Sequence, residues 1–148
     1  MKHLIWLLAL LSAPLAASMY DFRHQDLRTG QIQTLAGYRG HDTLLLFFEP
    51  QCRWCARQAK VLQQLKQQCP HLKQVAMGIN GNLPALRQAM FSLGISSRGF
   101  KPDPALLVQL GGIPATPVML MMNAQGQLVS GFRGFVPLTK LKPQLCAA

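Results

Sequence analysis

Residues 43–55, TLLLFFEPQCRWC, constrain the fold of this chain more than any other stretch. Residues 44–48 are apolar at every position, which predicts a central strand covered on both faces. After the second cysteine, apolar residues recur at helical spacing with basic and polar residues between them, which predicts an amphipathic helix. This helix is expected to end at Cys69, because a residue before proline disfavours the helical conformation. The cysteine pair is therefore placed where a buried strand passes into a helix N-terminus.

The CxxC pair, Cys52 and Cys55, predicts redox chemistry. Exposed N–H groups and the helix dipole favour a thiolate at a helix N-terminus, and Arg53 adds a positive charge beside the first sulfur. Cys52 is therefore the expected nucleophile, which attacks a client disulfide, and Cys55 resolves the mixed disulfide. A lone CxxC can also be an inert disulfide or half a zinc site. A strand, the pair and a helix in succession favour catalysis, and the chain offers no ligands at regular zinc spacing. We expect no metal, and no cofactor beyond the Cys52–Cys55 disulfide.

The N-terminal segment, residues 1–18, has the pattern of a signal peptide. Lys2 and His3 form a short cationic start, residues 4–11 an apolar core, and a small-residue cleavage region follows. The apolar core is about half as long as the ~20 residues that a spanning helix needs, although an uncleaved anchor is an alternative. Residues 19–148 are then a single domain of an exported protein, in which all four cysteines can form disulfides.

The chain is strongly basic, with a formal net charge of +10 that falls by one when Lys2 leaves with the signal peptide. The basic residues are scattered and are not interleaved with aromatic ones, so nucleic-acid binding is not expected. A solvated cationic face is one interpretation of this charge. Attraction to anionic lipid headgroups or acidic client proteins is another.

The remaining patterns predict an α/β domain. Further strands are expected over residues 75–79, 118–122 and 128–132, with short ones near 20–22 and 32–35. Residues 80–112 are expected to be an insertion with two helices, 82–94 and 103–110, joined by a flexible basic loop over 96–102. A last helix is expected over 137–145. This order predicts a thioredoxin-like fold: a mixed central sheet flanked by helices, with a helical insertion before the strand that follows Pro117.

Three local features resemble the periplasmic thiol:disulfide interchange proteins, and the resemblance covers roughly residues 29–145. FFEPQCRWC, residues 47–55, resembles the DsbC/DsbG pattern of an acid three residues before the first cysteine and an aromatic before the second. IPATP, residues 113–117, resembles the cis-proline loop of that family, and residues 128–132 match its final hairpin. The strand–CxxC–helix segment and the PATP run also resemble TrbB and TraF of conjugative transfer systems.

The resemblance implies a periplasmic thiol:disulfide oxidoreductase of the isomerase or reductase type. Its expected partners are exported client proteins that contain cysteines and a membrane or periplasmic redox partner protein, and the protein is expected to be a monomer. Pro117 is expected to be cis and to face the cysteines, and Thr116 to offer its backbone N–H and C=O to an extended client chain. Arg53 and Trp54 are expected at the client-facing rim.

Glu49, which occupies the position of the family's acid, is a candidate to relay the proton of Cys55. The alternative is a surface or helix-capping carboxylate paired with Arg53 or Arg57. The chain also departs from its relatives. Leu46 stands where thioredoxins and DsbA carry a buried acid, and the segment before the first long strand is too short for the dimerisation domain of DsbC.

The second pair of cysteines, Cys69 and Cys146, predicts a structural disulfide. About 13 helical residues at ~1.5 Å each place Cys69 roughly 20 Å from the active site, which excludes a resolving role. In a thioredoxin-like fold the last helix lies on the same sheet face as the redox helix and ends at the same far edge, so Cys146 should lie nearby. Two free thiols or an intermolecular bridge are the alternatives.

Three other functions are alternatives. LAGYRG, residues 35–40, is similar to the entry into the first long strand of the TlpA/ResA-like reductants that serve cytochrome assembly. A metal chaperone would bind copper through Cys52 and Cys55, and a purely structural secreted domain would use neither sulfur. The methionines of residues 118–122 are expected to fill the core rather than to bind copper, and the histidines show no ligand spacing.

Overall fold

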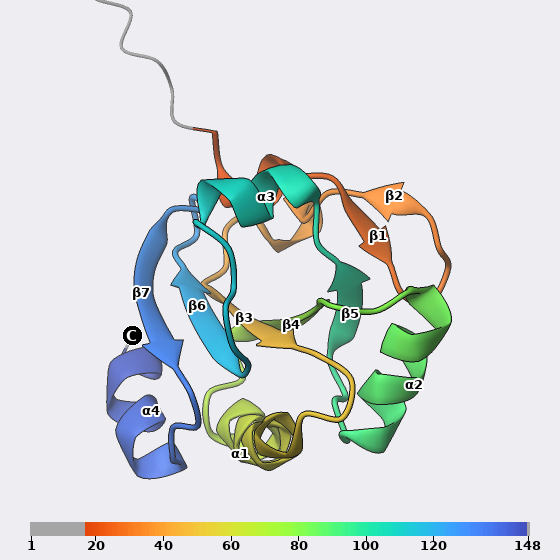
Figure 1. Ribbon diagram of the computed structural model, residues 1–148. Helices are drawn as coiled ribbons and strands as arrows, with labels where there is room; N and C mark the ends of the chain where they lie inside the picture. Colours follow the sequence, from red (N-terminus) through yellow and green to blue (C-terminus); the bar gives the residue numbers. More distant parts are fainter. Residues whose placement is uncertain (1–16, 148) are drawn as a thin grey trace, which may run out of the picture.

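The computed structural model describes residues 17–147 of the chain (Figure 1). The predicted signal peptide, residues 1–18, lies outside the described residues except for Ala17 and Ser18. Within the described part, no helix has both the length and the apolar character that crossing a membrane requires.

Among residues 17–147, seven strands form one mixed sheet at the centre of the fold. They are β1 (His24–Asp26), β2 (Ile32–Gln33), β3 (Thr43–Phe48), β4 (Lys73–Gly78), β5 (Arg98–Lys101), β6 (Val118–Met122) and β7 (Leu128–Arg133). Their order is β2-β1-β5-β4-β3-β6-β7, with β3, β4 and β5 parallel and the other neighbours antiparallel. Because β3 lies between β4 and β6, all its residues are buried, as its continuous apolar run predicts.

In the part of the chain that the structure describes, four α-helices cover the two faces of this sheet. They are α1 (Arg53–Gln68), α2 (Leu83–Ser92), α3 (Pro104–Gln109) and α4 (Leu138–Leu145). In Figure 1, α1 and α4 lie together on one side of the sheet and α3 on the other. The side chains of β3 alternate accordingly: Leu45 and Phe47 join the core cluster that contains Leu106 of α3, and Leu44 and Leu46 join the cluster beneath α1 and α4. The predicted mixed sheet flanked by helices is confirmed.

The prediction of a flexible loop over residues 96–102 is wrong, because strand β5 occupies most of this segment. β5 pairs with β4 on one side and with β1 on the other, and Phe100 is buried. Arg98 forms an ion pair with the buried Asp26 of β1. β5 contributes only one large apolar side chain to the core, so its sequence shows no hydrophobic periodicity. Its extended conformation depends on pairing with the neighbouring strands. The insertion before β6 is therefore mixed and not purely helical.

The prediction of a short strand near residues 20–22 is also wrong, because residues Met19–Asp21 form a 3-10 helix. Tyr20 is fully buried, and its hydroxyl donates to the Asn123 carbonyl in the β6–β7 turn at 3.1 Å. This long-range contact determines the local conformation more than strand propensity does. A second 3-10 helix, Ala36–Tyr38, occupies part of the loop that precedes β3.

Cys69 and Cys146 form a disulfide, with their Cα atoms 5.5 Å apart. The two cysteines are the C-caps of α1 and α4. Cys69 is fully buried in the apolar cluster that these two helices share with the sheet. The bridge thus lies at the opposite end of α1 from Cys52, which is the N-cap of that helix.

His24 is a fully buried titratable side chain in β1, to which the sequence assigns no role. Its Nδ1 accepts a hydrogen bond from the Asp103 backbone N–H at 3.0 Å, and its Nε2 has no partner among the described residues. Burial lowers the pKa of His24 to about 4, against a smaller opposing effect of the Asp103 carboxylate.

We expect the free energy of unfolding to fall by up to about 3 kcal/mol between pH 7 and pH 4 because of His24. The pKa of His24 is lower in the folded chain than the ordinary value of 6.5, so the unfolded chain binds the extra proton as the pH falls between these values. Urea unfolding at several pH values measures this slope. In His24→Asn, Oδ1 can replace Nδ1 as the acceptor, so the slope should flatten, whereas a His71→Asn control at an exposed position should keep it. Equal slopes in all three proteins would contradict this prediction.

Candidate active site

The turn between β3 and α1 carries the CxxC pair. After the buried Phe48, Gln51 adopts a left-handed conformation with φ 63°, which turns the chain into the helix. Cys52 is the N-cap of α1, and its Sγ accepts a hydrogen bond from the Cys55 backbone N–H at 3.1 Å. This contact satisfies one of the N–H groups that have no partner within the first helical turn.

The two cysteines form a disulfide but differ in exposure. Their Cα atoms are 5.1 Å apart. Cys55 is fully buried in the core cluster that contains Phe48 and Leu86, whereas Cys52 is only half-buried. The first turn of α1 contains no acidic residue, so the positive end of the helix dipole beside Cys52 is not neutralised locally. Arg53, exposed at the first helical position, adds a further positive charge.

A cis peptide bond joins Thr116 to Pro117 in the loop that precedes β6. Because β6 runs antiparallel to β3, the start of β6 lies at the sheet edge where β3 ends, and this loop therefore meets the CxxC turn. The Thr116 Oγ1 lies 3.4 Å from Cys52 Sγ, and Pro117 is buried. The structure thus brings together the CxxC turn and the cis-proline loop, although Cys52 and Thr116 are 64 residues apart in sequence.

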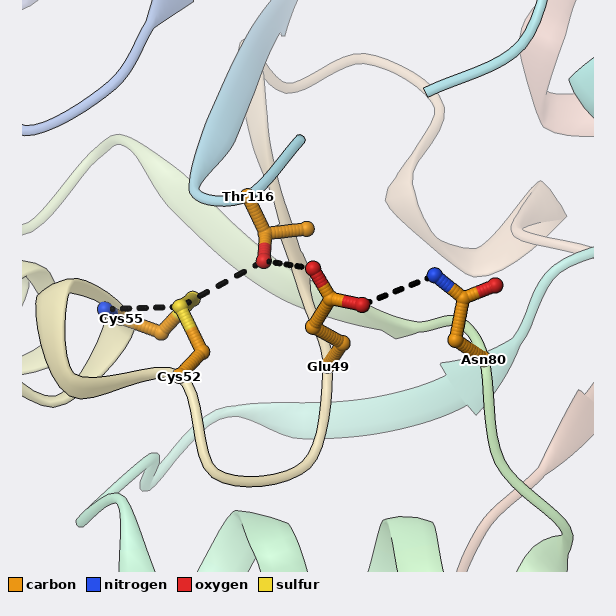
Figure 2. Close-up of a disulfide and its surroundings, with 5 residues drawn as sticks. All are labelled: Glu49, Cys52, Cys55, Asn80 and Thr116. Atoms are coloured by element: carbon orange, nitrogen blue, oxygen red, sulfur yellow. Dashed lines mark hydrogen bonds between the residues drawn. A yellow bond between two sulfur atoms is a disulfide. The ribbon is translucent and has the colours of Figure 1, made fainter. Parts of the chain in front are cut away.

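Glu49 connects to the same group of residues (Figure 2). Its Oε1 accepts a hydrogen bond from Thr116 Oγ1 at 2.7 Å, and its Oε2 accepts one from Asn80 Nδ2 at 2.8 Å. Among the described residues, these two hydrogen bonds join the Glu49 carboxylate to Thr116 and Asn80, and neither joins it to Cys55 or to an arginine. The carboxylate is therefore linked, through Thr116, to Cys52.

Asn80 is a site residue that the sequence reasoning did not identify. It follows β4, and because β4 is parallel to β3, the two strands end at the same sheet edge. Its φ of 56° places it in the left-handed region, which asparagine tolerates better than most residues. The only sequence signal was an Asn-Gly pair directly after a predicted strand, which indicates a turn but no contact.

Aromatic side chains line a groove next to the CxxC pair. Trp54 is 50% exposed, and its ring centroid lies 5.7 Å from that of Phe135, which follows β7. The Arg57 guanidinium lies over the Trp54 ring at 4.6 Å. A groove of about 330 Å³ runs here, lined by Trp54, Thr116, Pro117, Gly134 and Phe135. Phe135 had no detectable signal, because one aromatic in a loop carries no period.

No cluster of three or more His, Cys, Asp or Glu side chains suited to a metal ion occurs among residues 17–147. The chemistry that this arrangement offers comes from the two sulfurs, the helix N-terminus and the hydroxyl and carboxylate beside them. Such a set of groups can form, hold and break a disulfide.

Solved structures of several thiol:disulfide oxidoreductases share this fold. Mycobacterium tuberculosis DsbF, in mixed oxidised and reduced forms, has a TM-score of 0.74 at 18% identity over 90% of this chain and 98% of its own. A secreted disulfide oxidoreductase of the same organism, homologous to Escherichia coli DsbE, has a TM-score of 0.71 at 16% identity. The match covers 88% of this chain and 98% of that protein. A secreted thiol-disulfide isomerase from Corynebacterium glutamicum has a TM-score of 0.71 at 15% identity, and the match covers 85% of this chain and 81% of that protein. The fold is therefore thioredoxin-like.

Within this class, the model of the TraF family, described as F plasmid transfer operon protein, matches residues 11–145. The chain belongs to the TraF family. The predicted resemblance to thioredoxin-like proteins, and to TraF among them, is confirmed. No curated protein matches the chain.

Proposed function

We propose that this protein is a thiol:disulfide oxidoreductase of the isomerase or reductase type, which exchanges disulfides in exported client proteins through Cys52 and Cys55. The observation that carries the proposal is the difference between the two sulfur positions. Cys52 is half-buried at a helix N-terminus, and Cys55 is fully buried beside it. A large disulfide substrate can reach the first cysteine only, and the second is held ready to attack it.

Reduction of a client begins with the reduced pair. The Cys52 thiolate attacks one sulfur of the client disulfide, the client S–S bond breaks, and the second client sulfur leaves as a thiolate that takes up a proton. Cys55 then loses its proton and attacks Cys52 Sγ, which releases the first client sulfur as a thiol. The client gains two electrons and two protons, and the pair ends as a disulfide. A dithiol redox partner protein returns the two electrons.

In isomerisation, another client thiolate attacks the mixed disulfide and regenerates the Cys52 thiolate without net electron transfer.

The groove beside the disulfide provides a place for the client chain. Thr116 precedes Pro117 at the edge of this groove, where its backbone groups can pair with an extended client segment. Apolar client side chains would pack against Trp54 and Phe135, both partly exposed. The guanidinium of Arg57 over Trp54 favours clients with an acidic residue near the cysteine.

The predicted signal peptide and the family suggest where this exchange takes place. A signal peptide directs export, and we propose a periplasmic location. The description of the TraF family as an F plasmid transfer operon protein favours clients that belong to a conjugative transfer system. We further propose that the protein acts as a monomer and meets its redox partner through the same groove.

The isomerase or reductase direction is favoured over strong oxidation by the contacts of Thr116 and Glu49 at the disulfide. A reduction potential of about −120 mV, at the strongly oxidising end of the scale, would overturn this direction. A reductant for cytochrome assembly would use the same sulfur pair and would differ in its clients. A copper chaperone would hold a metal between the two thiolates and would form no covalent adduct with a client.

A Cys55→Ala variant tests the proposal, because it removes the resolving sulfur. We expect it to accumulate a mixed disulfide with oxidised insulin through Cys52, visible as an adduct on a non-reducing gel and by mass spectrometry, and lost on treatment with dithiothreitol. The Cys52→Ala/Cys55→Ala protein is the matched control and should form none. Expression with its predicted signal peptide would identify the natural clients in the same adduct. Absence of any adduct through position 52 would exclude the proposed exchange.

A further inference from the structure

The Thr116 hydroxyl lies between two acceptors but carries a single hydrogen. Its Oγ1 is 2.7 Å from Glu49 Oε1 and 3.4 Å from Cys52 Sγ, as Figure 2 shows. The hydrogen can point to only one of these atoms at a time. When it points to Glu49, the oxygen presents a lone pair to the sulfur. When it points to the sulfur, the hydroxyl donates a hydrogen bond there.

The surroundings of Glu49 favour the first arrangement. Its second oxygen accepts from Asn80 Nδ2 at 2.8 Å, so each carboxyl oxygen faces one donor, which suits a group that is acceptor-only as an anion. Hydrogen bonds to a charged acceptor are shorter and roughly twice as strong as neutral ones. The 2.7 Å contact from Thr116 Oγ1 to the carboxyl oxygen lies in the range of a hydrogen bond to a charged oxygen, whereas the cysteine sulfur at 3.4 Å is a weaker acceptor. A Glu49 carboxylate therefore outcompetes the sulfur for the hydroxyl hydrogen.

We propose that Glu49 is a positioning residue that acts on Cys52 through the Thr116 hydroxyl. As a carboxylate, Glu49 draws the hydroxyl hydrogen away from the sulfur, so the reduced Cys52 meets an oxygen lone pair that accepts from its S–H and repels a thiolate. Without this carboxylate, the hydrogen turns to Cys52 and stabilises the thiolate. The Cys55 N–H, which also donates to Cys52 Sγ, is fixed by the helix and does not change.

This control matters for the exchange reaction, and in that respect the inference rests on the proposed function. Stabilising the reduced form of a CxxC pair makes its disulfide a stronger oxidant, and destabilising the thiolate makes the dithiol a stronger reductant. The helix N-terminus and Arg53 favour the thiolate of Cys52. Glu49, acting through Thr116, opposes them and shifts the pair toward a reductant.

A titration of the Cys52 thiol tests this inference without any client. In the Cys55→Ala background Cys52 is the one free thiol, because the second disulfide holds the other two cysteines. The thiolate absorbance at 240 nm then gives the pKa of Cys52 for the parent, Glu49→Ala, Thr116→Val and the double variant. We expect Glu49→Ala to lower this pKa by about one pH unit, the size expected for a gained hydrogen bond to a charged group.

The Thr116→Val substitution provides the sharper part of the test, since a methyl group replaces the hydroxyl at nearly constant shape. We expect it to lower the pKa of Cys52 when Glu49 is present, because it removes the facing lone pair. In the Glu49→Ala background it should raise that pKa, because it removes a donor. Thr116→Ser, which keeps the hydroxyl, should keep the parent's response to Glu49→Ala.

Additive shifts of the two substitutions, within about 0.3 pH unit, or a coupling of the opposite sign would overturn the inference. A direct effect of the Glu49 charge on the sulfur would survive in the Thr116→Val background, so the cycle separates it from the hydroxyl-mediated effect. The titration does not depend on mixed-disulfide formation. Failure of the insulin adduct would therefore count against the proposed function alone, and additivity here against the role of Glu49 alone.

Discussion

A Cys52→Ser variant should lose thiol:disulfide exchange activity by at least ~10³-fold, because loss of a nucleophile removes the reaction path that the rest of the site serves. A serine hydroxyl does not ionise near neutral pH, whereas a cysteine at a helix N-terminus forms the reactive thiolate. The buried Cys55 cannot substitute for Cys52, since a client chain has no access to it. The rate of insulin reduction with dithiothreitol as the electron donor measures this loss.

The variant should nevertheless fold, which makes the loss interpretable. The serine oxygen can accept the hydrogen bond that Cys52 Sγ now accepts from the Cys55 N–H, and serine is among the favoured helix N-caps. A matched control removes the other cysteine pair, Cys69→Ala/Cys146→Ala, and should retain the activity per folded molecule. Activity near the wild-type level in Cys52→Ser would show that the exchange does not pass through this sulfur.

Removal of the Cys69–Cys146 disulfide should lower the free energy of unfolding by about 4 kcal/mol, because the bridge closes a long loop. The two cysteines are separated by 77 residues, so the unfolded chain gains considerable conformational freedom when the bridge is absent. We expect a lower urea midpoint for Cys69→Ala/Cys146→Ala and a larger m-value, since the unfolded state becomes less compact. Equilibrium unfolding in urea at constant pH measures both.

Comparison with the reduced wild-type protein isolates the effect of the bridge. Under a strong reductant both proteins lack the disulfide, and the difference in stability should fall to the packing lost at the buried Cys69. Insulin reduction by the folded variant should be unchanged, because this bridge is at the far end of α1 from Cys52. A variant as stable as the oxidised wild type would show that the bridge does not constrain the unfolded chain.

The local features of the site could be read from the sequence. The apolar run of β3 and the helical spacing of α1 are local signals that need no knowledge of the rest of the chain. Together they place Cys52 at the N-terminus of the helix. Asn82 and Asp103, each followed by a proline in the first helical turn, likewise mark the starts of α2 and α3. The cis conformation of Pro117 came from family resemblance, because the residues around a proline do not determine its isomer.

The sequence by itself determined where a thiolate would stand and which strand and helix would hold it, since those depend on residues within a few turns of one another. The tertiary structure decided which groups surround that sulfur. Asn80 and Phe135 reach the site because β4 and β7 take particular places in the sheet, and Glu49 contacts Thr116 because β6 runs antiparallel to β3. β5 is a strand because β4 and β1 pair with it. Periodicity records burial along one segment, whereas contacts between segments depend on strand order and register, which no single segment encodes.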